Sequence, residues 1–264
     1  MHLTCTPGSI SMHKYRVSLQ RDSFFLPMTT LLDVFPAELL ESIFSELSGE
    51  DKDCKALKAC SLTCRAFLPY CRQYIFGSIT ITPPFSTGSL TIGPIRLFGQ
   101  LIEGNPELAA YVRHLHLGLQ IEDFLYDGLP DVLAQLTYLK SVFIWFCSGY
   151  TVLDWKHMPA SFLPARSSLI RLILSPTIAC LKLRNFINFP ISILMQSTSL
   201  KELNIERLTI EDEIYTSSDQ PSHRHATPVQ LKSLILGKRA NRVALQMLHT
   251  HITRLAARFS TLRI

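Results

Sequence analysis

The stretch that decides the fold is FPAELLESIFSEL, residues 35–47, followed by SLTCRAFLPYCRQYIFGSITI, residues 61–81. Its first apolar residues recur at the spacing of one helix face and are Leu39, Leu40, Ile43, Phe44 and Leu47. Pro36 suits the first helical position, where its missing N–H is not needed. Gly49 suits a left-handed helix stop. The sequence therefore predicts an amphipathic helix that begins at Pro36 and ends at Gly49.

Two further short elements are predicted after this helix. Asp53 is a candidate cap for a second helix. The residues expected on one face of that helix are Leu57, Cys60, Ser61, Cys64 and Leu68. The apolar signal then continues through Gly77, in Tyr74, Ile75, Phe76, Ile79 and Ile81. A unit of about 47 residues buries too little apolar surface to be comfortable alone, so we expect it to have a neighbour.

The order and spacing of these residues resemble the F-box, a short trihelical adaptor-binding motif. Its pattern is Leu-Pro-x-Glu-Leu-Leu-x-x-Ile-Phe-x-x-Leu, then Val-Cys-Arg-x-Trp/Phe and a closing Leu-Phe. The matching residues here are Pro36, Glu38, Leu39, Leu40, Ile43, Phe44, Leu47, Cys64, Arg65, Phe67, Ile75 and Phe76. The chain departs at Phe35, where Leu is usual, and at Thr63, where Val is common. The sequence of this stretch also looks like that of the F-box-like proteins abundant in mushroom-forming fungi, which carry degenerate leucine-rich repeats after the box.

The resemblance implies a function in protein degradation. An F-box docks on a Skp-type adaptor, and through it on a cullin, within an SCF cullin-RING ubiquitin ligase. The residues it assigns to adaptor binding or to the core of the box are Pro36, Leu39, Leu40, Ile43, Leu47, Cys64 and Phe67. The sequence leaves open which of these residues bind the adaptor and which form the core of the box. The chain would be a substrate-recognition subunit without catalysis of its own, and we expect no cofactor.

Beyond the box, the pattern L-x-x-L-x-L recurs at intervals of 20 to 40 residues, which is typical of a solenoid. The sets are Val112, Leu115 and Leu117; Leu139, Val142 and Ile144; Ile178, Leu181 and Leu183; Leu200, Leu203 and Ile205; and Leu231, Leu234 and Leu236. Leu169, Leu172 and Leu174 also match, but SSLIRLIL equally fits a helix, so we favour the strand at Ile178. Between strands, DVLAQL and ISILMQS have helical composition. STLRI at the chain end could begin another strand.

These patterns predict an α/β fold, an N-terminal trihelical F-box followed by a curved leucine-rich-repeat-like α/β solenoid. The expected domains are a disordered or mis-annotated N-terminal extension over residues 1–30, the F-box over 31–82, and an irregular leucine-rich-repeat-like domain over 83–264. Met28 opens a more natural beginning than Met1, so two interpretations of residues 1–27 stay open: a flexible extension, or an upstream start chosen by gene prediction. Truncation at the C-terminal end is left open.

In each predicted strand the leucines point inward and the residues between them point outward. The outward residues that we predict to bind a target on a concave face are His114, His116, Phe143, Trp145, Lys182, Arg184, Glu202 and Asn204. Solvated aromatic side chains on a strand face are enriched in binding hot spots. The alternative is that a helix or loop covers Phe143 and Trp145.

Composition and cysteine usage bound the class of protein. The chain has 264 residues, 47% of them hydrophobic, and a net charge of +5. Its seven cysteines are an odd number without the spacing of a stapled secreted domain, so we expect a reducing compartment, cytoplasmic or nuclear. The gaps between Cys54, Cys60, Cys64 and Cys71 do not form a zinc knuckle. Buried small side chains are the better interpretation, and the three His-x-His pairs are better explained as solvated histidines than as metal ligands.

Other functional classes receive little support. Residues 223–264 hold eight Lys or Arg and no Asp or Glu, but no nucleic-acid-binding motif accompanies them, so we do not favour nucleic-acid binding. No apolar run approaches the roughly 20 residues of a membrane span. No nucleotide-binding, hydrolase or metalloprotease motif is present. Two alternatives to the ligase receptor stay open: a repeat scaffold whose box is structural or acts without the cullin, and a decayed or truncated family copy.

Overall fold

The computed structural model describes residues 36–50, 54–83, 93–147, 152–210, 231–237 and 261–263. These residues form a mixed α/β fold with one parallel sheet and several helices. The helices are α2 (Ala37–Glu50), α3 (Lys55–Thr63), α4 (Leu68–Ile75), α5 (Pro94–Gly104), α6 (Ile121–Phe124), α7 (Leu129–Gln135), α8 (Leu163–Ile173) and α9 (Ile191–Gln196). The strands are β1 (Ser78–Ile81), β2 (His114–Leu119), β3 (Ser141–Phe146), β4 (Leu153–Asp154), β5 (Cys180–Phe189), β6 (Glu202–Ile210), β7 (Ser233–Leu236) and β8 (Thr261–Arg263). Among these residues no helix is long and apolar enough to cross a membrane.

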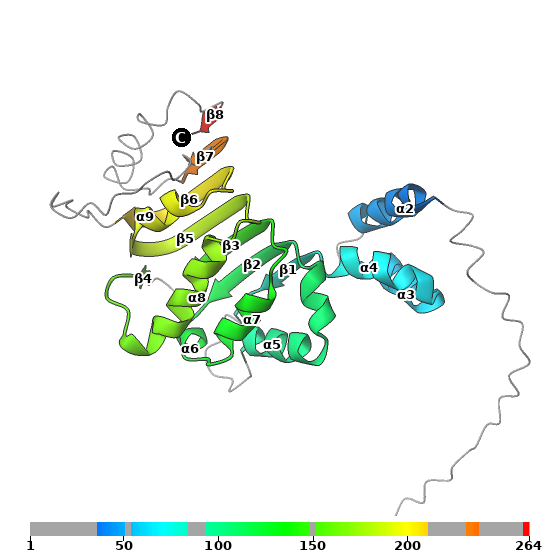
Figure 1. The fold of residues 1–264 in the computed structure, drawn as a ribbon, viewed down its shortest axis with the longest axis horizontal. Coiled ribbons are helices and arrows are strands. Elements are labelled where there is room, and N and C mark those ends of the chain that lie inside the picture. The colour runs from blue at the N-terminus through cyan, green and yellow to red at the C-terminus, as the bar shows by residue number, and fades with distance from the viewer. Residues whose placement is uncertain are drawn as a thin grey trace, which may run out of the picture.

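The strands are ordered almost as they occur in the chain. The sheet runs β1-β2-β3-β5-β6-β7-β8, all pairs are parallel, and β4 pairs with β5 beside the main path. Helices α5, α7 and α8 lie side by side on one face of the sheet (Figure 1). The helices α2, α3 and α4 lie together beyond β1, at the opposite end of the sheet from β8 (Figure 1). The described helices therefore leave the other face of the sheet uncovered.

Two buried columns of aliphatic side chains run across the sheet on its helix-covered face. The first joins the half-buried Ile79 to its buried partners Leu115, Val142, Leu181, Leu203 and Leu234. The second joins Ile81, Leu117, Ile144, Leu183, Ile205 and Leu236. Every predicted L-x-x-L-x-L set takes its place in these columns, so the predicted strands are confirmed. The helix α8 contains Leu169 and Leu172, which also confirms the preference for Ile178 as the start of the following strand set.

Two strands at the ends of the sheet extend this pattern. β1 was not predicted as a strand, although Phe76, Ile79 and Ile81 have the same spacing as Val112, Leu115 and Leu117. The helical spacing of the residues before Gly77 masked the strand pattern of β1, because Tyr74 and Ile75 belong to α4. At the other end, β8 pairs with β7 and confirms that STLRI begins a strand. The repeat pattern thus starts inside the region predicted as F-box.

The same backbone feature precedes five successive strands. One carbonyl just before each strand accepts two N–H groups from the start of the next: Gly77 from Arg113 and His114, Arg113 from Lys140 and Ser141, Lys140 from Ala179 and Cys180, Ala179 from Lys201 and Glu202, and Lys201 from Lys232 and Ser233. These bonds are 2.7–3.1 Å long. This hydrogen-bonding pattern recurs between the starts of β1, β2, β3, β5, β6 and β7, so this part of the chain is built from similar structural units despite unequal spacing.

The three N-terminal helices have a small core of their own. Its buried side chains are Leu40, Phe44, Leu57 and Cys71. The Phe44 ring lies 5.5 Å from the Phe67 ring and 5.8 Å from the Tyr70 ring, so it is held from two sides. Tyr74 donates a hydrogen bond of 3.1 Å to the Glu41 carbonyl, which joins α4 to α2. Every one of these helices therefore contributes to one packed unit.

The helix limits differ from the predicted ones. Pro36 lies just before α2 rather than at its first position, and its carbonyl accepts the N–H groups of Leu39 and Leu40. The predicted stop at Gly49 is wrong, since α2 continues to Glu50. The proposed cap, Asp53, lies outside the described residues, and α3 begins after Cys54, whose φ is 52°.

The predicted second helix is two helices. α3 ends at Thr63, and Cys64 has extended backbone with φ of −145° and ψ of 126°. A 3-10 turn, η1 (Arg65–Phe67), then leads into α4, where Pro69 occupies an early helical position. Cys64 and Leu68 consequently do not continue the α3 face. The predicted boundary after residue 82 falls just beyond β1, and the predicted extension over residues 1–30 lies outside the described residues.

Candidate functional site

The helix-free face of the sheet carries the outward residues of each strand in two aligned rows. One row contains His114, Ser141, Cys180, Glu202 and Ser233, and the next contains His116, Phe143, Lys182, Asn204 and Ile235. Farther along the strands, Gly118, Trp145, Arg184 and Glu206 form a third alignment. All eight residues predicted for target binding thus lie on one face of four neighbouring strands, β2, β3, β5 and β6. We call the aligned group from His116 through Glu206 the aromatic-charged strip, defined by His116, Phe143, Trp145, Lys182, Arg184 and Glu206.

Three rings form a continuous cluster at one end of the strip. The His116 and Phe143 ring centroids are 5.8 Å apart in an edge-to-face arrangement. The Phe143 and Trp145 centroids are 4.7 Å apart with the planes tilted by 31°. All three side chains are half-buried, so each ring keeps part of its surface accessible among the described residues. The three rings together form a contiguous aromatic surface, and aromatic side chains are enriched among the residues that dominate binding interfaces.

Gly118 is the reason that Trp145 can lie where it does. A Cβ atom at Gly118 would come within 2.8 Å of Cε2 and Cζ2 of Trp145 and of Cδ of Pro83. The indole therefore lies over the glycine backbone of β2 and beside Pro83, in space that any other residue at position 118 would occupy. Sequence reasoning did not identify Gly118 or Pro83 as parts of the site. The available signal was a glycine at the outward position directly opposite Trp145 in neighbouring strands.

Three charged side chains lie next to the rings. Nζ of Lys182 is 2.8 Å from Oε1 of Glu206 and 4.8 Å from the centroid of the Phe143 ring. Nε of Arg184 is 3.6 Å from Oε2 of Glu206, which is an ion pair but too long for a hydrogen bond. Lys182 is therefore engaged on two sides, by a carboxylate and by a ring. The Arg184 side chain is 41% exposed, and its guanidinium donates no hydrogen bond to a described residue.

The remaining predicted residues lie on the N-terminal side of the strip. Burial lowers the pKa of His114, and the positive charges of Lys140, of His116 when it is protonated, and of Arg113 lower it further, so we treat His114 as neutral at pH 7. Glu202 is exposed. Asn204 is half-buried, and its Oδ1 is buried without a hydrogen-bond partner among the described residues. Burial raises the pKa of the Cys180 thiol, which favours the uncharged form of this neighbour of Glu202.

The second predicted group, on the three N-terminal helices, divides into buried and exposed residues. Leu40 is in the core, and Leu47 and Phe67 are half-buried against it. Leu39 and Ile43 are about half exposed, at 51% and 49%. They are four residues apart on α2 and share one face of it. Pro36 is also exposed, and Cys64 is half-buried. The structure thus separates the core residues of this group from the exposed ones.

Of the four cysteines near this core, Cys60 lies in α3, Cys71 lies in α4, and Cys54 and Cys64 flank α3. Cys71 is buried, while Cys54, Cys60 and Cys64 are half-buried. Burial raises the pKa of the Cys71 thiol, with a smaller contribution from Cys60. In the part of the chain that the structure describes, no three His, Cys, Asp or Glu side chains are arranged to hold a metal ion. Residues His223, His225, His249 and His251, the other two His-x-His pairs, lie outside the described residues.

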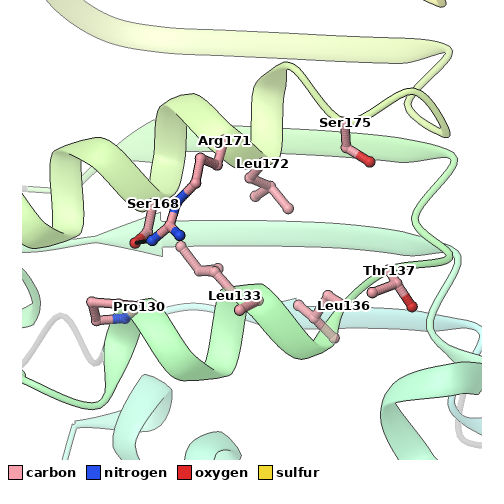
Figure 2. Close-up of a pocket in the computed structure, with 9 residues that line it drawn as sticks. Pro130, Leu133, Leu136, Thr137, Ser168, Arg171, Leu172 and Ser175 are labelled. Carbon is pink, nitrogen blue, oxygen red and sulfur yellow. Dashed lines mark hydrogen bonds between the residues drawn. The ribbon is translucent and has the colours of Figure 1, made fainter.

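A groove of about 170 Å³ lies on the opposite, helix-covered side of the molecule, between α7 and α8. Figure 2 shows Leu133 of α7, and Leu136 just after α7, facing Leu172 and Arg171 of α8 across it. One guanidinium nitrogen of Arg171 donates a 3.0 Å hydrogen bond to the Ser168 hydroxyl. Sequence reasoning did not identify this groove. Because it is wide open and its cation is already paired with a hydroxyl, we regard the strip and the α2 face as the candidate interaction surfaces.

Comparison with known proteins adds no identification. No protein-family model matches the chain, and no curated protein matches it. The functional assignment therefore rests on the residues and geometry described above.

Proposed function

We propose that this chain is the substrate-recognition subunit of an SCF cullin-RING ubiquitin ligase. In this proposal the α2–α4 unit is an F-box that docks on a Skp-type adaptor, and the strands form a leucine-rich-repeat-like array that holds a target protein. The observation that carries the proposal is the exposure of Leu39 and Ile43. These motif residues lie outside the core, on one face of α2, and so are available to a partner.

The packing of the unit supports the F-box interpretation. Other motif positions, Leu40 and Phe44, form its core, and Phe67 packs against Phe44. A unit with a core this small gains stability when an exposed apolar face is covered by a partner. Motif residues thus separate into those that hold the helices together and those that remain available, as a docking module requires.

The sheet supports the repeat interpretation. One aliphatic pattern and one hydrogen-bonding pattern recur at successive strands, while each strand buries one face only. Stacking of such units buries a continuous core on one side and leaves a continuous surface on the other. We place target binding on that surface, at the aromatic-charged strip.

The chain would contribute no covalent chemistry in this role. A receptor that binds the ligase at one surface and its target at another raises the effective concentration of target lysines near the ubiquitin-loaded enzyme. Leu39 and the Trp145 ring lie on separate parts of the chain, so both partners can be bound together.

The test is co-purification of the chain with a Skp-type adaptor and cullin. Leu39→Ala combined with Ile43→Ala should reduce adaptor binding by about 100-fold or more, because each truncation of an interface anchor costs about 2 kcal/mol. Leu97→Ala combined with Leu101→Ala is the matched control. These two leucines are also four residues apart, on α5, and are 52% and 42% exposed. The control should bind the adaptor normally.

Equal adaptor binding by both double variants would contradict the proposal, provided that circular dichroism shows both to be folded.

A second candidate, a repeat scaffold whose box is a structural cap, is favoured by one contact. Arg72 of α4 forms a 2.8 Å ion pair with Glu107 of the 3-10 helix η2 (Pro106–Tyr111), so the helical unit is joined to the sheet domain. Recovery of the adaptor without cullin would favour the scaffold.

A further inference from the structure

We infer that the aromatic-charged strip binds an extended acidic peptide segment, in which a carboxylate side chain is held by Arg184 and a large apolar side chain rests on Phe143 and Trp145. The inference rests on the proposed target-binding role of the sheet and specifies the chemistry of the target. It follows from the accessibility of the strip, the rigidity of its rings and the balance of its charges.

The rings are held in place before any partner arrives. Trp145 is confined by the backbone of Gly118 and by Pro83, and Phe143 is flanked by Trp145 and His116. Lys182 lies 4.8 Å from the centroid of the Phe143 ring, which restricts that ring further. A rigid aromatic surface loses little side-chain entropy on binding, so an apolar side chain of a partner can be bound efficiently there.

The cations of the strip are not equivalent. Lys182 is paired with Glu206 at 2.8 Å, whereas Arg184 lies 3.6 Å from the same carboxylate and is more exposed. The Arg184 guanidinium therefore keeps donors available for a planar two-oxygen acceptor. A carboxylate matches that fork, since two parallel N–H to oxygen bonds can form.

The surroundings of the strip attract negative charge. Two lysines, Lys140 and Lys201, occupy positions just before β3 and β6 along its edge. Together with Lys182 and Arg184 they outnumber the acidic residues on the described part of this face, Glu202 and Glu206. Such an excess raises the local concentration of an acidic segment and speeds its encounter, with a strong dependence on salt. A carboxylate fits better than a phosphate dianion because the negative charge of Glu206, whose Oε2 lies 3.6 Å from Nε of Arg184, repels a second negative charge there.

The spacing of an extended peptide suits the site. Side chains two positions apart in an extended peptide project on the same side at about 7 Å, a distance between the roughly 5 Å that separates adjacent strands and the roughly 10 Å that three strands span. The Trp145 ring leans over β2 while Arg184 lies on β5, on the other side of β3. We therefore expect the acidic and apolar residues of the segment to be two positions apart.

Selection from a random 12-residue peptide library displayed on phage tests the inference directly. On the purified full chain we expect enrichment of sequences with Asp or Glu two residues from an aromatic or large aliphatic residue. Synthetic peptides of the consensus should lose about tenfold or more in affinity for Trp145→Ala and for Arg184→Gln, measured by fluorescence polarisation. Affinity should also fall as salt is raised.

Charge reversal provides the decisive comparison. Selection on Arg184→Glu should enrich Lys or Arg in place of Asp or Glu, whereas Arg171→Glu, which changes an exposed arginine in the groove between α7 and α8, should leave the consensus unchanged. Failure to recover binders that depend on Trp145 and Arg184, a basic consensus on the unchanged chain, or tighter binding of phosphoserine peptides than of their glutamate versions would overturn the inference. Adaptor binding is scored separately. Normal adaptor binding with no acidic consensus overturns the inference alone, and an acidic consensus without adaptor binding overturns the proposed function alone.

Discussion

The three-helix unit and the sheet domain are stabilised in different ways. Among its described residues the unit has four buried side chains, those of Leu40, Phe44, Leu57 and Cys71. The sheet domain buries the same two columns at every strand and covers them with helices. In the sheet each unit supports its neighbours, so stability is distributed, whereas the helices depend on a few contacts. The unit with the small core is also the one with an exposed apolar face on α2.

The largest expected effect is the loss of the small core. Phe44→Ala should destabilise the α2–α4 unit by about 3–5 kcal/mol, because it removes a buried ring and leaves a cavity. Phe44 touches both Phe67 and Tyr70, so no neighbouring ring can replace it. Hydrogen exchange should show lost protection of amides in residues 37–75 with little change in β2, β3 and β5.

Leu183→Ala is the counterpart in the sheet. It should lower the free energy of unfolding of the sheet domain by about 2–5 kcal/mol. Hydrogen exchange of the α2 amides should stay slower in this variant than in Phe44→Ala. If Phe44→Ala instead exposes the strands as strongly as the helices, the two regions unfold together and the contrast between them fails.

A smaller effect is expected on the helix-free face. Gly118→Ala should destabilise the chain by about 1–3 kcal/mol, because the added methyl group meets Trp145 and Pro83 at 2.8 Å. It should also move the Trp145 ring. Trp155 is buried, so iodide quenching of tryptophan fluorescence reports mainly on Trp145 and should increase.

Gly104→Ala is the matched substitution, since nothing lies within 4 Å of the added Cβ. It should shift the urea midpoint only slightly and leave the iodide quenching unchanged. Unchanged quenching in Gly118→Ala would show that Gly118 does not position the indole.

A weaker effect concerns the link between β4 and β5. Burial raises the pKa of Asp154, but hydrogen bonds from the side chains of His157 and Asn188 outweigh it and lower that pKa to about 2. A lowered carboxyl pKa stabilises the fold above the ordinary value of 3.8, and this contribution is lost as the pH falls toward 2.

Asp154→Asn should therefore cost no more than about 1 kcal/mol at pH 5, since the side chain is one-third exposed and the ion pair is screened by water. Urea unfolding at pH 5 and at pH 2.5 measures the gap between the variant and the unchanged chain. The gap should shrink at the lower pH. A gap of constant size would mean that Asp154 does not contribute through its charge.

The smallest effect is expected at the contact between the two regions. Arg72→Ala should change the free energy of unfolding by about 0–1 kcal/mol, because the pair with Glu107 is largely exposed. A double-mutant cycle with Glu107→Ala isolates the pair. A coupling well above 1 kcal/mol would indicate that the helical unit and the sheet are more tightly joined than this contrast assumes.

The strand arrangement was largely predictable. Side chains alternate strictly in a strand, so a set such as Leu139, Val142 and Ile144 determines which neighbours face outward. The outward positions of Phe143, Trp145 and Arg184 followed from that alternation. β1 was missed because its short I-T-I sequence directly follows helical residues, and helical and strand spacings overlap in so short a segment.

The helix ends and the second helix were less predictable. Cys64 is extended although its neighbours favour a helix, because local preference is weak compared with the packing of α3 and α4 on α2. For the same reason Gly49 did not end α2. Single residues suggest such limits, but tertiary contacts choose among them.

By itself the sequence determined the class of structure: a short helical unit with an F-box-like pattern, followed by strands whose repeated leucines face one way. Only the tertiary structure decided which motif residues are exposed, because Leu39 and Leu40 are adjacent in the helix and differ in burial through the position of α3 and α4. It also decided that Glu206 pairs closely with Lys182 and leaves Arg184 available. Such differences depend on distances between side chains of different strands, and alternation along one strand contains no information about those distances.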